Sequence, residues 1–88
     1  CYAFNDIAPQ APVHFLVIPK AHIASVAGVN EENSAVVAHI FEVIAKLTKE
    51  KGIESYRVVS NIGEQAGQSV PHLHFHVLAG RDMTWPPG

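Results

Sequence analysis

Three histidines occupy every second position of the short stretch HLHFHV, at His72, His74 and His76. Successive side chains of a β-strand point to opposite faces, so the three imidazoles are predicted to share one face, opposite Leu73 and Phe75. A strand rises about 3.3 Å per residue, which puts the backbones of alternate histidines roughly 6.6 Å apart and lets the rings lean together. Such a regular row, opposed by an apolar face, indicates a chemical site rather than a polar covering of a sheet.

Two kinds of chemistry fit a row of imidazoles. Neutral imidazole is a common zinc ligand, and two histidines separated by one residue on a strand can both reach one ion. Alternatively, a neutral ring nitrogen can attack phosphorus directly, since the unperturbed pKa of histidine, about 6.5, leaves much of it uncharged at neutral pH. Neighbouring rings would then hold the phosphate oxygens, fix the tautomer of the attacking ring and move the proton that the leaving group needs.

The loop that precedes the histidines favours the phosphate interpretation. Gly67, Gln68 and Ser69 supply backbone N–H groups, an amide and a hydroxyl, which are donors suited to an oxyanion. A metal site needs ligands and acceptors that support those ligands. The residues by themselves therefore favour phosphate chemistry, and a zinc site is the alternative that a metal analysis decides.

Length and composition limit the partners. The chain has 88 residues, of which 48% are hydrophobic and 16% charged, which is typical of one compact domain that buries surface against a partner subunit. The formal net charge is −2 and no basic run occurs, which argues against nucleic-acid binding. No apolar run approaches the roughly 20 residues of a membrane-spanning helix. Cys1 is the only cysteine, so we expect a reducing, cytoplasmic compartment.

The sequence pattern predicts an α+β fold with one long helix and an antiparallel sheet. Strands are predicted at about 13–18, 55–60 and 72–79, and residues 1–5 have the character of the end of an earlier strand. The helix is predicted over 30–51. We expect a single domain over the whole chain, from which a preceding segment is missing, because the opening CYAFNDIAPQAP resembles the middle of a domain.

The predicted helix carries its own start and stop signals. Asn30 is a suitable N-cap, Glu31 and Glu32 lie where the helix dipole favours negative charge, and Gly52 is a natural residue to follow the last turn. Apolar residues recur at helical spacing and form a broad stripe, which could pack on the sheet with one side and on another subunit with the other: Val36, Val37, Ile40, Phe41, Ile44 and Leu47.

The segment HLHFHVLAG resembles the His-x-His-x-His-x-x signature of the histidine triad superfamily, whose x positions are hydrophobic. DIAPQAPVHFLVIPKAH, the Gly-Gln-Ser before the triad and the terminal WPPG are similar to the Hint branch, the histidine triad nucleotide-binding proteins. The likeness covers nearly the whole chain and is weaker in the predicted helix. The uridylyltransferase branch typically has Gln where His76 stands, and the diadenosine polyphosphate hydrolase branch lacks the Trp-Pro-Pro-Gly ending.

The resemblance implies a homodimer in which the long helix and a strand meet their symmetry mates. It implies a purine nucleoside phosphoramidase that hydrolyses compounds such as adenosine 5′-monophosphoramidate or lysyl-AMP through a nucleotidyl-histidine intermediate. The ligand would be a purine nucleotide of the AMP or GMP type, and neither a metal nor a cofactor is implied. A nucleotide-binding interaction protein with vestigial hydrolysis is the alternative.

The resemblance also implies a set of catalytic residues. His74 is similar to the family's nucleophile, and His72 and His76 are similar to the imidazoles that contact phosphate oxygens and orient the attacking ring. His14 is similar to a fourth histidine that completes the proton network. Ser69 is similar to the residue that bonds the bridging or leaving atom.

A second set is similar to the family's nucleotide-binding residues. A carboxylate that accepts hydrogen bonds from two ribose hydroxyls, apolar side chains around the base, polar groups near phosphate and ribose, and a tail tryptophan that reaches the partner's site are expected at Asp6, Phe4, Ile7, Asn61, Gly67, Gln68 and Trp85. Family members carry a further N-terminal segment that supplies the other wall of the base pocket, so the base preference is left open.

Overall fold

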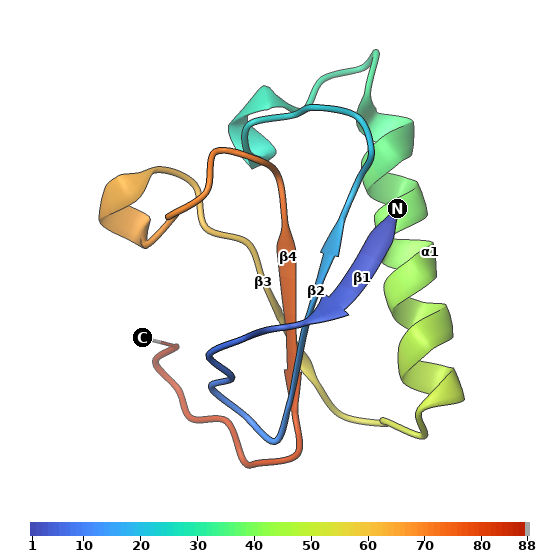
Figure 1. Ribbon diagram of the computed structural model, residues 1–88, viewed down its shortest axis with the longest axis vertical. Helices are drawn as coiled ribbons and strands as arrows, with labels where there is room; N and C mark the ends of the chain where they lie inside the picture. Colours follow the sequence, from blue (N-terminus) through green and yellow to red (C-terminus); the bar gives the residue numbers. More distant parts are fainter. Residues whose placement is uncertain (88) are drawn as a thin grey trace.

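One long helix packs against a four-stranded antiparallel sheet in the computed structural model, which describes residues 1–87 (Figure 1). The strands are β1 (Tyr2–Asn5), β2 (Val13–Ile18), β3 (Arg57–Val59) and β4 (Phe75–Ala79), in the spatial order β1-β2-β4-β3. The helix α1 (Ser34–Glu50) and two short 3-10 helices, η1 (Val26–Gly28) and η2 (Glu64–Ala66), complete the order of elements. The predicted α+β fold is confirmed. Across residues 1–87, no helix has the combined length and apolar character that crossing a bilayer requires.

The two central strands place one face of the sheet in the core and leave the other for the histidines. In β4 the burial alternates, with Phe75 and Val77 buried and His76 half-buried between them. Antiparallel pairing puts Leu16 of β2 opposite His76. The core consists of the inward residues of both strands and of apolar neighbours from α1 and from two loops: Phe15, Val17, Ile23, Ile40, Ile44, Leu73, Phe75 and Val77. The period-2 alternation predicted for this segment is therefore confirmed, since it separates the histidines from the apolar core.

The helix begins later than the sequence predicted, at Ser34 rather than at position 30. Asn30 closes the turn before the helix, where its Oδ1 atom accepts the backbone N–H groups of Glu32 at 2.9 Å and of Asn33 at 3.2 Å. An Asn that satisfies N–H groups two and three residues ahead performs the function of a cap, but here it acts one turn before the regular helix. Gly52 follows the helix with φ 71°, the left-handed conformation expected of a residue that ends a helix.

Two strands are shorter than predicted, with β3 at 57–59 instead of 55–60 and β4 at 75–79 instead of 72–79. The residues before β4 bond to loops rather than to strands. The N–H of Leu73, for example, donates to the carbonyl of Ile23 at 2.6 Å. Leu73 is still buried, which leaves His72 and His74 on the opposite side of the chain as in a strand.

Candidate active site

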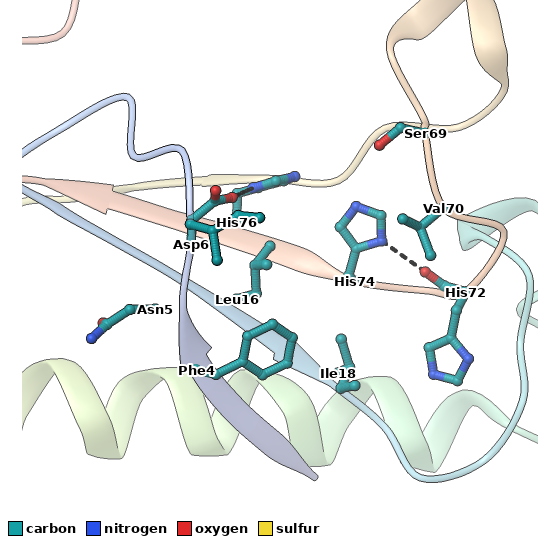
Figure 2. Close-up of a pocket in the computed structure, with 11 residues that line it drawn as sticks. Phe4, Asn5, Asp6, Leu16, Ile18, Ser69, Val70, His72, His74 and His76 are labelled. Atoms are coloured by element: carbon teal, nitrogen blue, oxygen red, sulfur yellow. Dashed lines mark hydrogen bonds and ion pairs between the residues drawn. The ribbon is translucent and has the colours of Figure 1, made fainter.

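A pocket of about 560 Å³ lies on the face of the sheet that carries the histidines (Figure 2). Of the residues expected from the sequence, its lining includes Phe4, Asp6, Ile7, Ser69, His72, His74 and His76. Four lining residues were missed by the sequence analysis: Asn5, Leu16, Ile18 and Val70. Leu16 and Ile18 had a detectable signal, because they alternate with the residues of β2 that face the core.

The ring of His74 is held in one tautomer by the main chain. Its Nδ1 atom lies 2.7 Å from the carbonyl oxygen of His72. A carbonyl can only accept, so Nδ1 must carry the proton, and in the neutral ring Nε2 keeps a free lone pair. Figure 2 shows the ring of His74 at the centre of the pocket, between Asp6 with His76 on one side and Ser69 with Val70 on the other. The middle histidine is therefore an accessible, oriented nitrogen base.

The backbone of His74 is anchored as well. The hydroxyl of Ser60, the residue after β3, donates to the carbonyl of His74 at 2.8 Å. The regular pairing of β3 with β4 ends at Val59 and His76. The Ser60 side chain adds one further hydrogen bond beyond that point. The sequence analysis did not identify Ser60, since a serine at the end of a strand carries no signal of its distant partner.

A second chain of hydrogen bonds fixes the tautomer of His76. The backbone N–H of Gln10 donates to His14 Nδ1 at 3.0 Å, so the proton of the neutral His14 ring lies on Nε2. That nitrogen lies 2.9 Å from His76 Nδ1, which must then accept. The remaining proton of neutral His76 therefore lies on Nε2, where it is available as a donor. His14 is buried on β2, which pairs with β4.

Asp6 faces these two imidazoles. Its Oδ2 atom lies 3.4 Å from His14 Nε2 and 3.9 Å from His76 Nδ1. Its Oδ1 atom accepts the backbone N–H of Ala8 at 2.7 Å. The carboxylate lines the pocket, where it is accessible to a ligand. Its predicted bonds to ribose hydroxyls stay a prediction.

Burial lowers the pKa of His76 from the usual 6.5, and the neighbouring His74 and His14 lower it further, while Asp6 acts in the opposite direction. A charged imidazole is poorly solvated in this position and is repelled by any other charged ring nearby. His76 is consequently neutral at neutral pH, as the hydrogen-bonded tautomer requires.

His72 acts at the edge of the site. Its Nε2 atom lies 3.1 Å from the carbonyl oxygen of Pro19, to which it donates, and its ring packs against that of His22 with 5.5 Å between the centroids. From the family resemblance, the flanking rings were expected to orient His74. In the structure the carbonyl of His72, rather than its imidazole, holds His74.

Four of the predicted nucleotide-binding residues lie outside the pocket lining. Gly67 has φ 98° and ends η2, and Asn61 lies beside it. The side chain of Gln68 is hydrogen-bonded to backbone atoms of its own and a neighbouring loop. Trp85 is 83% exposed on the tail. Their roles toward a nucleotide stay predictions.

Within residues 1–87, the group with suitable spacing for a metal ion is Asp6, His14 and His76, rather than the three triad histidines. Its hydrogen bonds oppose that use. A metal on His14 Nε2 would displace the ring's proton, while the other ring nitrogen already accepts the N–H of Gln10. The ring would have to become an anion or lose that bond, so the donor set fits a proton-bearing network better than a zinc site.

Known proteins match this chain in both sequence and fold. Residues 1–83 match the family model described as HIT domain. An uncharacterized HIT-like protein of Synechococcus elongatus is 47% identical over 89 residues, which cover 100% of this chain and 78% of that protein. A HIT family hydrolase from Legionella pneumophila is 49% identical, with a TM-score of 0.93 over 98% of this chain and 79% of that chain. A histidine triad protein from Clostridium difficile is 45% identical, with a TM-score of 0.88 over 93% of this chain and 73% of that chain.

The chain therefore belongs to the HIT-domain family. The resemblance to the histidine triad superfamily is confirmed at this level, and the antiparallel sheet with one long helix is the fold shared with these structures. Membership of the Hint branch stays a prediction.

Proposed function

We propose that this chain is a hydrolase of the Hint branch that cleaves the P–N bond of purine nucleoside 5′-phosphoramidates, such as adenosine 5′-monophosphoramidate or lysyl-AMP. The observation that carries the proposal is the bond of His74 Nδ1 to the carbonyl of His72, which in the neutral ring leaves the lone pair on Nε2, in a pocket of about 560 Å³, a volume in the range of small-molecule sites. The similarity to proteins named HIT family hydrolases supports hydrolysis as the general activity.

In the first step, the lone pair of His74 Nε2 attacks the α-phosphorus in line with the departing amine. A bond from the ring to phosphorus forms as the P–N bond of the substrate breaks. The amine leaves with a proton from the Ser69 hydroxyl, which takes one from water in turn. The positive charge that develops on the ring is stabilised by the bond from Nδ1–H to the carbonyl of His72.

In the second step, water attacks the same phosphorus and the bond to His74 breaks, so that Nε2 regains its lone pair. The proton lost by water passes to solvent, and the nucleoside monophosphate is released. The Nε2–H of His76, fixed as a donor by His14, supports the phosphate oxygens in both steps.

The rest of the pocket suits a nucleoside. Five apolar side chains line the pocket together with the histidines and offer contacts to a flat base rather than specific hydrogen bonds: Phe4, Ile7, Leu16, Ile18 and Val70. Asp6 lies beside His76 in the same pocket, and we assign it the contact with the ribose hydroxyls.

We also propose that the protein forms a homodimer through α1 and β3. In the described sheet β3 is an edge strand, and such edges are commonly covered by another chain. Phe41 of α1 is 47% exposed despite its size. The exposed Trp85 would then reach the partner's pocket. The cytoplasmic location and the absence of a nucleic-acid partner stay predictions.

A quench experiment tests the enzymatic proposal. Protein mixed with a phosphoramidate labelled at phosphorus is stopped in alkali, which preserves phosphohistidine, and mass spectrometry locates the label. We expect label on His74, and none in His74→Asn. Turnover at the wild-type rate in His74→Asn would refute the proposal. Binding of AMP with negligible wild-type turnover favours the interaction-protein alternative, and a stoichiometric zinc ion on the imidazoles would favour the metal alternative.

A further inference from the structure

The amide of Gln68 bonds to three backbone groups in two loops. Its Oε1 atom accepts the N–H of Gly63 at 2.9 Å. Its Nε2 atom donates to the carbonyl of Ala24 at 2.7 Å and to that of Val70 at 3.0 Å. The opposite orientation of the amide would bring its oxygen against two carbonyl oxygens, so only this one satisfies the network.

These contacts link the loop before β4 to the segment before α1. Figure 1 shows the end of this loop beside the segment that contains η1. Gly63 and Gln68 also exchange a second bond, from the N–H of Gln68 to the carbonyl of Gly63 at 3.1 Å, which closes the loop around η2. The residues directly after Gln68 are Ser69 and Val70, which form one wall of the pocket.

Both N–H groups of the amide are already committed to carbonyls, which leaves neither for a phosphate. The remaining lone pair on Oε1 would repel a phosphate oxygen. We propose that Gln68 is a positioning residue, which holds Ser69 and Val70 against His74, and not a phosphate ligand. The inference deepens the proposed hydrolase function and depends on it for its catalytic consequence.

Loss of the Gln68 hydrogen bonds should affect the reaction geometry more than the affinity for the nucleotide. The hydroxyl of Ser69 must meet the departing amine, and a displacement of about 1 Å can cost on the order of 100-fold in rate. Most side chains proposed to contact the nucleoside lie on β1 and β2 or directly after β1, and among them only Val70 belongs to the loop that Gln68 holds. We therefore expect kcat to fall while the affinity for AMP changes little.

The test uses the near-isosteric Gln68→Met, which keeps the length and removes all three bonds, and Gln68→Glu, which keeps only an acceptor for Gly63. The matched control is Gln65→Met in η2, since Gln65 is exposed and its side chain forms no hydrogen bond within residues 1–87. Three quantities are measured: amide hydrogen exchange at Gly63, the Kd of AMP by calorimetry, and kcat and KM for adenosine 5′-monophosphoramidate.

We expect Gln68→Met to speed exchange at Gly63 and to lower kcat by about tenfold or more, with the Kd of AMP within about threefold of wild type. Gln68→Glu should retain slow exchange at Gly63 but lose kcat, because its second oxygen faces the carbonyls of Ala24 and Val70. A large loss of AMP affinity with unchanged kcat, or unchanged exchange at Gly63, overturns the inference. If the wild-type protein shows no turnover, the proposed function is refuted. Hydrogen exchange at Gly63 and the Kd of AMP then still decide the role of Gln68.

Discussion

The backbone carbonyl of His72 accepts a 2.7 Å hydrogen bond from Nδ1–H of His74. The group that orients the proposed nucleophile is thus part of the main chain, two residues away, and cannot change its protonation state. The free lone pair at Nε2 follows from it directly. The rings of His72 and His76 are not needed to orient His74. His76 can therefore serve as a donor, and His72 can bond to Pro19.

Replacing the side chain of His72 should therefore leave the tautomer of His74 unchanged. We expect His72→Asn to keep the ¹⁵N shifts that identify a protonated Nδ1 and an unprotonated Nε2 in His74, because the accepting carbonyl is retained. The measurement is a ¹⁵N–¹H correlation spectrum of the histidine rings above pH 7. A switch of the His74 proton to Nε2 in this variant would show that the imidazole of His72, and not its carbonyl, sets the tautomer.

The lowered pKa of His76 predicts a loss of stability in acid. When a folded-state pKa is below the unfolded value of 6.5, the unfolded chain binds more protons as the pH falls through 6.5 towards the folded pKa. The free energy of unfolding should therefore decrease in that window, and above it the contribution of His76 is fully retained. Urea unfolding at about pH 7.5 and about pH 5.5 measures the decrease.

The matched variant is His76→Gln, whose amide oxygen can still accept from His14 Nε2 and which does not titrate. We expect a smaller decrease between the two pH values in His76→Gln than in wild type. Equal decreases would mean that His76 titrates normally in the folded protein.

Ser60 should matter for stability through its bond to the carbonyl of His74. Ser60→Ala leaves this carbonyl without its side-chain donor, and we expect the free energy of unfolding to fall by about 1 kcal/mol. Ser55→Ala is the control, because Ser55 is exposed and its hydroxyl forms no hydrogen bond within the described chain. Denaturant unfolding of both variants gives the comparison, and equal stabilities would remove the structural role of Ser60.

Gly80, which follows β4, has φ 92°, and a Cβ atom there would lie 2.9 Å from Cβ of Pro12. Gly80→Ala therefore combines left-handed backbone strain, about 1 kcal/mol, with a clash that adds on the order of 1–3 kcal/mol. Gly52→Ala isolates the first term, since Gly52 has φ 71° and no atom of the described chain lies within 4 Å of an added Cβ. We expect Gly80→Ala to lower the melting temperature clearly more than Gly52→Ala does. Equal shifts would show that Pro12 moves aside at no cost.

Several patterns with short-range causes were predicted correctly from the sequence, although the start of the helix was not. The alternation around His74 depends only on the two-residue period of an extended chain, so the shared face of the histidines and the burial of Leu73 were predictable. Gly52 was recognisable because an α-helix commonly ends on a left-handed residue. The fold class followed from the same local periods, and the resemblance to the histidine triad superfamily was carried by contiguous motifs.

What the sequence by itself determined is thus the kind of chemistry and the face on which it lies. Tertiary structure alone decided where β4 begins, because the N–H of Leu73 bonds to Ile23, and what Gln68 does, because its amide reaches Ala24. It also decided the proton position on His76, which depends on the ring of His14 from a different strand. Hydrogen bonds between residues far apart in the chain leave no periodic trace in the sequence, whereas the local geometry of a strand does.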